Sequence, residues 1–211
     1  MRIIQAEFVK GAISAEQFPE LSVPEFAFFG RSNAGKSSLI NMLVNRKNLV
    51  KTGARPGMTR EINFFLVNKP AGAKTGLPVS QKGAEVFALT DLPGYGYAKI
   101  SGGMTLQIDK MLYEYCTNRP RLKVLFFLMD MRRSPSDVEK RSVDFFQNIG
   151  IEVIIVGTKS DKIGKNEQVN TKRAWADFFG FNTDVIITTS AAKKTGRDSI
   201  LHIISQRCME R

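Results

Sequence analysis

Short apolar runs recur along this chain and are rich in β-branched or aromatic residues. Five are distinct and a sixth is weaker, at residues 25–30, 62–67, 85–91, 123–130, 151–159 and 184–190. Most of these runs are continuous rather than alternating, which is typical of strands buried on both faces of a sheet. The run at 62–67 shows this pattern least clearly.

Helical patterns fill most of the segments between these runs. They cover residues 35–45, 105–118, 134–150, 166–180 and about 196–209. The third pattern begins with Ser-Pro and acidic residues and ends at Gly150, which are typical start and stop signals of a helix. The side chains of these helices that we expect in the core are Leu106, Met111, Leu112, Trp175, Phe178, Phe179, Ile200, Ile203 and Ile204.

Strands that alternate with helices predict βαβ units and a largely parallel sheet. The runs 62–67 and 85–91 are the exception, because no helical pattern separates them, and we expect an antiparallel hairpin there. Their connection, 68–83, is rich in Gly, Pro and Lys, as surface loops are. The sequence therefore predicts an α/β fold with a six-stranded, mostly parallel sheet, one antiparallel strand and helices on both faces. We expect one domain over 1–211, with a short N-terminal extension over about 1–22.

Composition places the chain among ordinary globular proteins. It has 211 residues, of which 43% are hydrophobic and 24% charged. No apolar run is long enough to span a membrane, and the N-terminus lacks the features of a signal or transit peptide. We therefore expect a cytoplasmic monomer without stable membrane insertion.

Charge and rare residues narrow the possible chemistry. The net charge of +11 suits a polyanionic partner such as nucleic acid or an anionic membrane surface, although a merely basic enzyme is an alternative. His202 is the only histidine, which argues against a histidine-based zinc site or a Ser-His-Asp triad. Cys116 and Cys208 lie far apart, outside any CxxC pattern, and are expected to be buried free thiols.

The stretch GRSNAGKS, residues 30–37, matches the P-loop pattern G-x-x-x-x-G-K-[ST]. It follows a predicted strand and opens a predicted helix, which is the context this motif requires. Backbone N–H groups at such a helix N-terminus wrap phosphate oxygens. Lys36 is expected to reach the β- and γ-phosphates, and Ser37 to give its hydroxyl to Mg²⁺.

Two further positions fit a nucleotide-sensing site. Asp91 ends a predicted strand and opens DLPG, where an aspartate can hold Mg²⁺ through a water and the Gly94 N–H can contact the γ-phosphate. Thr59 lies in a loop between the P-loop and Asp91 and can close on Mg²⁺. A solvated turn residue is an equally good interpretation of Thr59 on sequence alone.

The ends of the last two predicted strands carry groups that suit guanine. Asp161 in TKSD can accept two hydrogen bonds from guanine N1–H and N2–H, which adenine cannot offer. Lys159 can lay its aliphatic stem over the base. In SAAKKTG, the backbone N–H of Ala191 or Ala192 can donate to guanine O6. Ligands of open α/β sheets bind at these carboxyl ends of strands.

These motifs together resemble the five G motifs of the translation-factor-related GTPases. More narrowly, FFGRSNAGKSSLIN, PGMTREINFF, DLPGYGYA and TKSDK resemble the EngB family, over about residues 20 to 205. The resemblance implies a Ras-like P-loop fold, binding of GTP or GDP with Mg²⁺, and a role in assembling the large ribosomal subunit from rRNA and ribosomal proteins. It also implies a need for the protein in cell division and septation.

The resemblance also implies a set of site residues. Those expected to bind the nucleotide are Gly30, Arg31, Ser32, Asn33, Ala34, Gly35, Lys36, Ser37, Ser38, Gly57, Met58, Thr59, Arg60, Glu61, Asp91, Leu92, Pro93, Gly94, Thr158, Lys159, Ser160, Asp161, Ser190, Ala191 and Ala192. The catalytic residues would be Lys36, Thr59 and Gly94, and the Mg²⁺ ligands Ser37, Thr59 and Asp91. Thr158 stands where many GTPases have Asn, and we expect it to brace neighbouring loops by hydrogen bonds.

Tyr95 occupies the place of the glutamine that positions water in many GTPases. A phenol cannot take over that role, so we expect slow intrinsic turnover, on the order of 10⁻⁴ s⁻¹ or below, until a partner docks. We expect Tyr95, Gly96 and Tyr97 to form a mobile, partly aromatic switch. Asn33 either shapes the P-loop or helps to hold a K⁺ ion that supplies positive charge to the phosphates.

Other functions remain open at this point. A nucleotide or small-molecule kinase of this fold would need an arginine-rich lid, which the sequence lacks. A non-enzymatic GTP-gated adaptor at a membrane or division site would bind GTP without stimulated turnover. An RNA-binding module alone is disfavoured, because no KH or RRM pattern is present.

Overall fold

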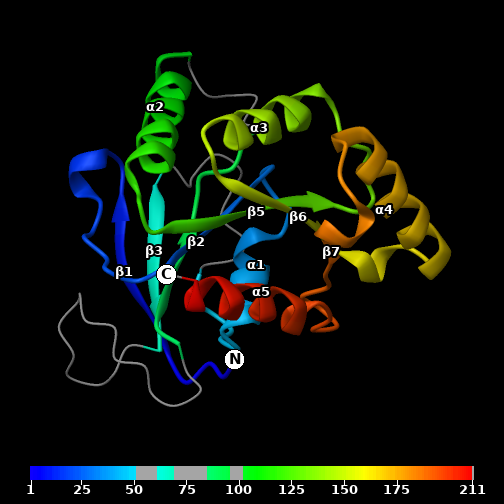
Figure 1. Ribbon diagram of the computed structural model, residues 1–211, viewed down its shortest axis with the longest axis horizontal. Helices are drawn as coiled ribbons and strands as arrows, with labels where there is room; N and C mark the ends of the chain where they lie inside the picture. The colour runs from blue at the N-terminus through cyan, green and yellow to red at the C-terminus, as the bar shows by residue number, and fades with distance from the viewer. Residues whose placement is uncertain (51–60, 69–84, 96–101, 211) are drawn as a thin grey trace.

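The computed structural model describes residues 1–50, 61–68, 85–95 and 102–210 of the chain (Figure 1). The strands within these residues form one sheet in the order β1-β3-β4-β2-β5-β6-β7. Their bounds are Ala6–Ala12 (β1), Glu25–Gly30 (β2), Ile62–Val67 (β3), Phe87–Asp91 (β4), Leu122–Asp130 (β5), Glu152–Thr158 (β6) and Ile186–Thr188 (β7). The α-helices are Lys36–Leu43 (α1), Gly102–Asn118 (α2), Asp137–Asn148 (α3), Lys165–Phe179 (α4) and Arg197–Met209 (α5).

Strand directions confirm the predicted sheet type. β3 pairs antiparallel with both β1 and β4, whereas the pairs β2–β4, β2–β5, β5–β6 and β6–β7 are parallel. The predicted hairpin is therefore the β3–β4 pair. The strands read as continuous apolar runs because both of their faces are covered, and every residue of β2 is buried.

The sheet has a strand that the sequence did not predict. β1 lies within the segment expected to be an N-terminal extension, and it pairs with β3 from Ala6 opposite Val67 to Ala12 opposite Ile62. It is an edge strand, interrupted by a register shift between Phe8 and Lys10, and most of its residues are only partly covered. Because an edge strand with a bulge needs no continuous apolar run, its sequence gave little signal.

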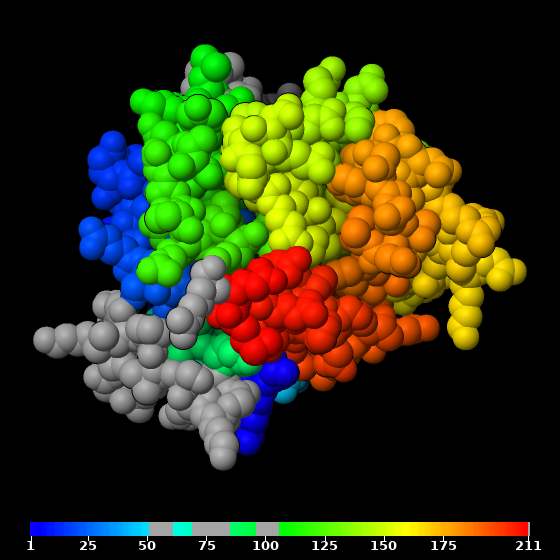
Figure 2. All heavy atoms as spheres, viewed as in Figure 1, coloured from blue at the N-terminus to red at the C-terminus, as the bar shows by residue number. Residues whose placement is uncertain are grey.

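Helices cover both faces of the sheet, as predicted (Figure 1). Side chains of α1 and α5 join one core cluster with alternate residues of the strands, for example Leu39 and Ile200. Side chains of α2, α3 and α4 join the other cluster, for example Met111, Val143 and Trp175. In the space-filling view these three helices lie next to one another along one side of the molecule (Figure 2).

Six of the nine helix residues expected in the core are buried, and Ile203 is partly buried against the core. Leu106 is 70% exposed and Phe178 is 37% exposed, so the expectation was wrong for both. Leu106 lies in the second turn of α2, where it lines a groove between α2 and α3, and the ring of Phe178 contacts that of Phe179. None of the described helices is long and apolar enough to cross a bilayer.

A buried ion pair fixes the start of β2, the strand that leads into the P-loop. The Arg119 guanidinium donates to both carboxylate oxygens of Glu25, at 2.6 and 3.2 Å, and to the Pro19 carbonyl at 2.9 Å. The Tyr115 hydroxyl donates to the same carboxylate at 3.3 Å. The end of β2 opposite the P-loop is thereby tied to the end of α2.

Candidate functional site

The carboxyl ends of the parallel strands meet at one edge of the sheet and carry nearly all of the predicted site residues. The P-loop follows β2, and α1 begins at Lys36. The loop needs glycine at two points. A Cβ on Gly30 would collide with the Leu128 carbonyl oxygen of β5, and Gly35 has a left-handed φ of 96°. The backbone N–H groups that open α1, including those of Lys36 and Ser37, have no partner within the helix, which makes this end suited to an anion.

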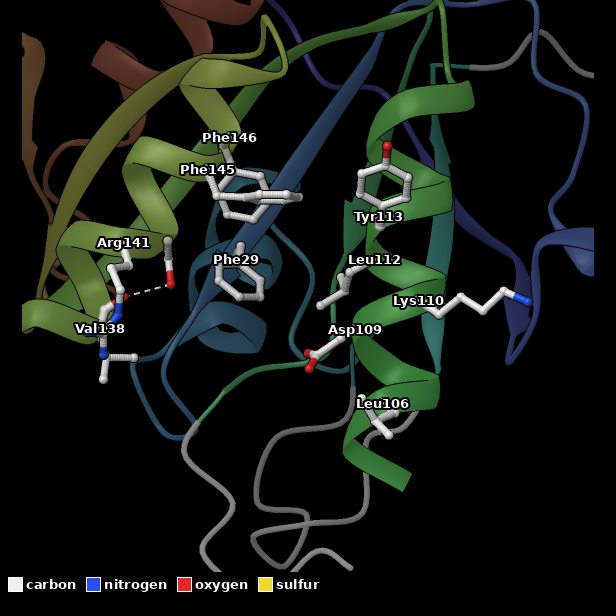
Figure 3. Close-up of a pocket in the computed structure, with 11 residues that line it drawn as sticks. Phe29, Leu106, Asp109, Lys110, Leu112, Tyr113, Val138, Arg141, Phe145 and Phe146 are labelled. Atoms are coloured by element: carbon white, nitrogen blue, oxygen red, sulfur yellow. Dashed lines mark hydrogen bonds between the residues drawn. The ribbon is translucent and has the colours of Figure 1, made fainter. Parts of the chain in front are cut away.

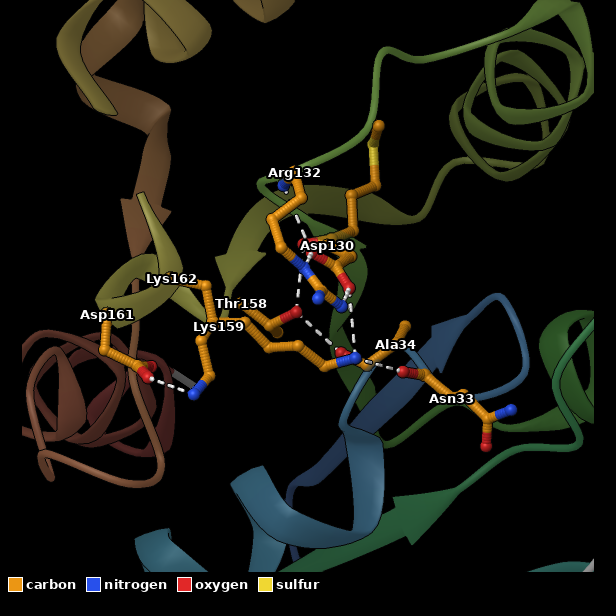
Figure 4. A network of polar contacts seen from close by, with 9 residues as sticks. Asn33, Ala34, Asp130, Arg132, Thr158, Lys159, Asp161 and Lys162 are labelled. Atoms are coloured by element: carbon orange, nitrogen blue, oxygen red, sulfur yellow. Dashed lines mark hydrogen bonds and ion pairs between the residues drawn. The ribbon is translucent and has the colours of Figure 1, made fainter. Parts of the chain in front are cut away.

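Two consecutive residues of the fourth motif hold the P-loop from the β6 side (Figure 4). The Thr158 hydroxyl lies 2.6 Å from the Ala34 carbonyl oxygen and 3.1 Å from that of Met129. The Lys159 ammonium donates to the Asn33 carbonyl at 2.8 Å. These contacts confirm that Thr158, in place of an asparagine, braces the neighbouring loop.

Asp130, at the end of β5, is a residue of this edge that the sequence analysis did not single out. Its carboxylate accepts hydrogen bonds from the Arg132 guanidinium at 2.6 and 2.9 Å and from Lys159 at 3.0 Å. Burial raises its pKa, but these cations outweigh burial, so the pKa lies well below its ordinary value. The ionised Asp130 therefore fixes the Lys159 ammonium above the P-loop. The sequence did offer a signal for this site residue, namely the acidic Asp130 at the end of a predicted strand with Arg132 two positions later.

The residues predicted to bind guanine meet at the ends of β6 and β7. The Ser190 hydroxyl donates to Asp161 Oδ1 at 2.5 Å, and the Lys193 N–H donates to Ser190 Oγ at 3.1 Å. The hydrogen bond from Ser190 is the main cause that lowers the pKa of Asp161. An ionised, oriented carboxylate can accept the two N–H donors of guanine. Ser160 is held nearby by its N–H bond to the Thr189 carbonyl.

Asp91 is the buried acid of the site and suits a magnesium ion. Its side chain is 3% exposed, and among the described residues its Oδ1 has no hydrogen-bond partner. Burial raises the pKa of this carboxyl to about 6, and the nearby Lys36 ammonium opposes the shift only in part. Magnesium usually takes one or two protein oxygens and completes its shell with phosphates and waters. The unpartnered Asp91 oxygen and the Ser37 hydroxyl fit that role, and within the described ranges no cluster of three or more His, Cys, Asp or Glu side chains offers a site of another kind.

Gly94 lies directly against the P-loop. A Cβ at this position would come within 2.8 Å of the Gly30 carbonyl oxygen, 3.1 Å of the Lys36 ammonium and 3.2 Å of the Ser32 nitrogen. Only glycine fits so close to these atoms. The backbone N–H of Gly94 is thus near the lysine predicted to reach the γ-phosphate.

The Tyr95 side chain makes specific contacts with its neighbours, and the mobile switch expected over Tyr95, Gly96 and Tyr97 stays a prediction. The Tyr95 side chain is half-buried, packs on Phe29 and Phe127, and donates its hydroxyl to Glu139 Oε1 at 2.7 Å. Burial, followed by the Glu139 carboxylate, raises the pKa of the phenol, which stays a neutral donor. Gly96 and Tyr97 lie outside the described residues, as do Gly57, Met58, Thr59 and Arg60 of the other predicted switch.

A groove of about 600 Å³ between α2 and α3 is separate from this edge (Figure 3). Its walls are mostly apolar, with Leu112 and Tyr113 of α2 facing Val138 and Phe145 of α3. No predicted nucleotide-binding residue lines it. The polar edge around the P-loop, and not this groove, is therefore the candidate nucleotide site.

Known proteins resemble the chain over nearly its whole length. The family model described as a 50S ribosome-binding GTPase matches residues 25–159. A Treponema denticola protein named "Probable GTP-binding protein EngB" is 69% identical over 212 residues, covering 98% of this chain and 100% of that one. A crystal structure of a probable GTP-binding protein engB matches with a TM-score of 0.63 and 25% identity, over 89% of this chain and 100% of that one. Era in complex with MgGDPNP and nucleotides 1506–1542 of 16S ribosomal RNA shares the fold, with a TM-score of 0.67 and 21% identity over 91% of this chain and 59% of Era.

The fold, the P-loop edge and these matches define the class of the protein. It is a GTPase with a P-loop, which binds GTP and hydrolyses it. More narrowly, the chain belongs to the EngB family of GTP-binding proteins. GTPases of this kind generally use Mg²⁺.

The buried Asp91 carboxyl predicts a specific pH dependence of stability. Folding raises its pKa from 3.8 to about 6, so the unfolded chain loses this proton at lower pH than the folded one. Between these values the free energy of unfolding should fall as pH rises, by up to about 3 kcal/mol for this group. Asp91→Asn should remove that part of the pH dependence.

Urea unfolding at pH 4 to 7.5, without nucleotide or magnesium, measures the effect as the difference between wild type and variant. The matched control is Asp198→Asn, because the Asp198 side chain is 99% exposed. If Asp91→Asn and wild type show parallel pH profiles, the carboxyl is not desolvated as the structure indicates.

Proposed function

We propose that the nucleotide binds along the P-loop edge with roles divided among the strand ends. The N–H groups from Gly30 to Ser38 and the Lys36 ammonium hold the phosphates. Ser37 and Asp91 take Mg²⁺, which when bound supplies positive charge to the phosphates. The Gly94 N–H meets the γ-phosphate. The observation that carries this proposal is the convergence of Gly94, Lys36 and the unpartnered Asp91 oxygen at the N-terminus of α1.

For the base, we propose that Asp161 reads guanine N1–H and N2–H, while the stem of Lys159 covers its plane. The N–H groups of Ala191 or Ala192 would donate to O6. Support comes from the Ser190–Asp161 hydrogen bond, which orients the carboxylate, and from the position of both segments at adjacent strand ends. We also propose that the chain is a single GTP-binding domain that acts as a monomer in the cytoplasm.

Asp161→Asn tests the assignment of the base. Losing the charged acceptor should weaken GTP binding roughly a hundredfold, since two charge-assisted hydrogen bonds are lost. Xanthosine triphosphate, which offers an acceptor where guanine has its amino group, should bind the variant better than it binds wild type. Titration with fluorescent nucleotides measures both affinities, with Asp184→Asn as the control, because Asp184 is exposed in the 3-10 helix Thr183–Val185 that precedes β7. Unchanged GTP affinity would contradict the assignment.

We propose that hydrolysis is slow without a partner. Tyr95 stands where many GTPases have a water-positioning glutamine, and its hydroxyl is engaged by the Glu139 carboxylate. The described residues therefore offer no side chain at this position to orient the attacking water. Intrinsic turnover on the order of 10⁻⁴ s⁻¹ or below follows.

We propose that the Asn33 side chain helps to hold a K⁺ ion at the phosphates, where the ion would supply positive charge. Asn33 has a left-handed φ of 65°, so it also shapes the loop, and the two roles can be separated. Asn33→Gly keeps that conformation accessible but removes the side-chain ligand. Wild-type turnover should be about tenfold faster in KCl than in NaCl, in line with typical charge-stabilisation effects, and the variant should lose the difference. Equal wild-type rates in both salts would rule out the potassium role.

We propose that the chain acts as a GTP-controlled switch in assembly of the large ribosomal subunit and is needed for normal cell division and septation. The net charge of +11 suits rRNA, and the matching family model is described as ribosome-binding. The alternative is a GTP-gated adaptor outside the ribosome. The adaptor would use the same nucleotide site but would bind a partner other than the ribosomal subunit.

Sedimentation with large-subunit precursors separates these two functions. The chain should pellet with the particles when it holds a non-hydrolysable GTP analogue, and much less with GDP or no nucleotide. Asp161→Asn is the control, because it should require the xanthosine analogue instead of the guanosine one. Tight GTP-analogue binding without any co-sedimentation would favour the adaptor.

A further inference from the structure

Tyr95 is attached to the P-loop by its backbone. The Ser32 N–H donates to the Tyr95 carbonyl at 3.0 Å, and Arg31 and Tyr95 form a parallel bridge. Upstream, the Leu92 N–H donates to the Phe28 carbonyl at 3.0 Å. The backbone on either side of Gly94 therefore runs along the end of β2, and its position depends on what holds Tyr95.

The Tyr95 side chain is held by a second element, α3. Its ring lies 5.5 Å from that of Phe29 and 6.1 Å from that of Phe127, between ring centroids. Its hydroxyl donates to Glu139 Oε1 at 2.7 Å. The ring contacts orient the Tyr95 side chain, and the hydrogen bond to Glu139 fixes the position of its hydroxyl.

Glu139 is itself immobilised. Its side chain is 7% exposed, and its Oε2 accepts the Ser136 N–H at 2.9 Å and the Ser136 hydroxyl in the capping box that begins α3. Both oxygens of the carboxylate are thus engaged, one by the helix cap and the other by Tyr95. A charged acceptor makes the bond to Tyr95 stronger than one between neutral groups.

From this arrangement we propose that Glu139 is a positioning residue, which acts through Tyr95 to hold Gly94 beside Lys36 before a nucleotide arrives. The proposal rests on the role assigned above to the Gly94 N–H, namely contact with the γ-phosphate. The Gly94 N–H is then already in place when GTP binds, so GTP binding does not carry the entropic cost of ordering the backbone around Gly94. GDP has no γ-phosphate, so the preordered Gly94 N–H does not increase its affinity. The link between Tyr95 and Glu139 thereby favours GTP over GDP.

Tyr95→Phe is the most direct test, because it removes only the hydroxyl and keeps the ring on Phe29 and Phe127. Affinity for a non-hydrolysable GTP analogue should fall roughly tenfold, the size expected for a lost hydrogen bond to a charged group. Affinity for GDP should stay within about twofold, because the ordering cost applies only to the state with a γ-phosphate. Stopped-flow binding of fluorescent derivatives measures both.

Glu139→Ala and the double variant complete the test as a cycle. If the two residues act through one hydrogen bond, the double variant should lose no more selectivity for the GTP analogue than the more affected single variant. Tyr113→Phe is the matched control, because it removes a hydroxyl from a half-exposed tyrosine of α2 and leaves the bond between Tyr95 and Glu139. It should leave the ratio of GTP-analogue to GDP affinity unchanged.

Gly94→Ala separates failure of this inference from failure of the proposed site. Loss of GTP-analogue affinity in Gly94→Ala together with wild-type selectivity in Tyr95→Phe would overturn the role of Glu139 and leave the site intact. Unchanged selectivity in Gly94→Ala would overturn both. Additive effects of Tyr95→Phe and Glu139→Ala would also overturn it, because the two side chains would then act independently.

Discussion

The P-loop is fixed from both sides by neighbouring strand ends, and the rest of the site depends on this constraint. From β6, Thr158 and Lys159 approach the carbonyl oxygens of Ala34 and Asn33. From the segment after β4, the carbonyl of Tyr95 accepts the N–H of Ser32. A glycine-rich loop loses more conformational freedom on ordering than other segments do. Contacts to its carbonyl groups offset this cost, and they keep its N–H groups directed toward one point, where a phosphate can bind. The segments that hold these carbonyls are those proposed to bind the base and to sense the γ-phosphate.

The two acids at this edge show how burial and partners assign different roles to the same side chain. Asp130 is bound by Arg132 and Lys159, its pKa is lowered, and its oxygens are occupied, so it acts as a strut for Lys159. Asp91 is more deeply buried, has one unpartnered oxygen, and its pKa is raised. A desolvated carboxylate without a partner is unfavourable in the free protein and becomes favourable when a cation arrives. The edge thus has the charge balance that the proposed metal–nucleotide complex would complete.

The sequence predicts those parts of the structure whose signal is local. Short patterns specify the P-loop, Asp91 at the end of β4, Asp161 just after β6, and the buried strands, and these parts lie where expected. The edge strand β1 was missed because it is half exposed and interrupted by a bulge. The hydrogen bond from Tyr95 to Glu139 joins residues 44 positions apart, and the one from Lys159 to Asp130 joins residues 29 positions apart. No local sequence pattern specifies such pairs. Only the packing of α3 and β6 on β5 brings them together.

The position after Gly94 illustrates a trade between positioning and catalysis. A glutamine there is useful in many GTPases because it is free to turn toward an attacking water. In this chain the same position carries a tyrosine whose ring is packed on Phe29 and whose hydroxyl is bound by Glu139. That attachment fixes the backbone next to Gly94 and occupies the hydroxyl, so the side chain is not free to turn as a glutamine is. With Gly94 in its proposed role as sensor of the γ-phosphate, fixing that sensor and supplying a mobile catalytic group are competing uses of one residue, and the proposed assistance to hydrolysis then comes from an ion or from a docked partner.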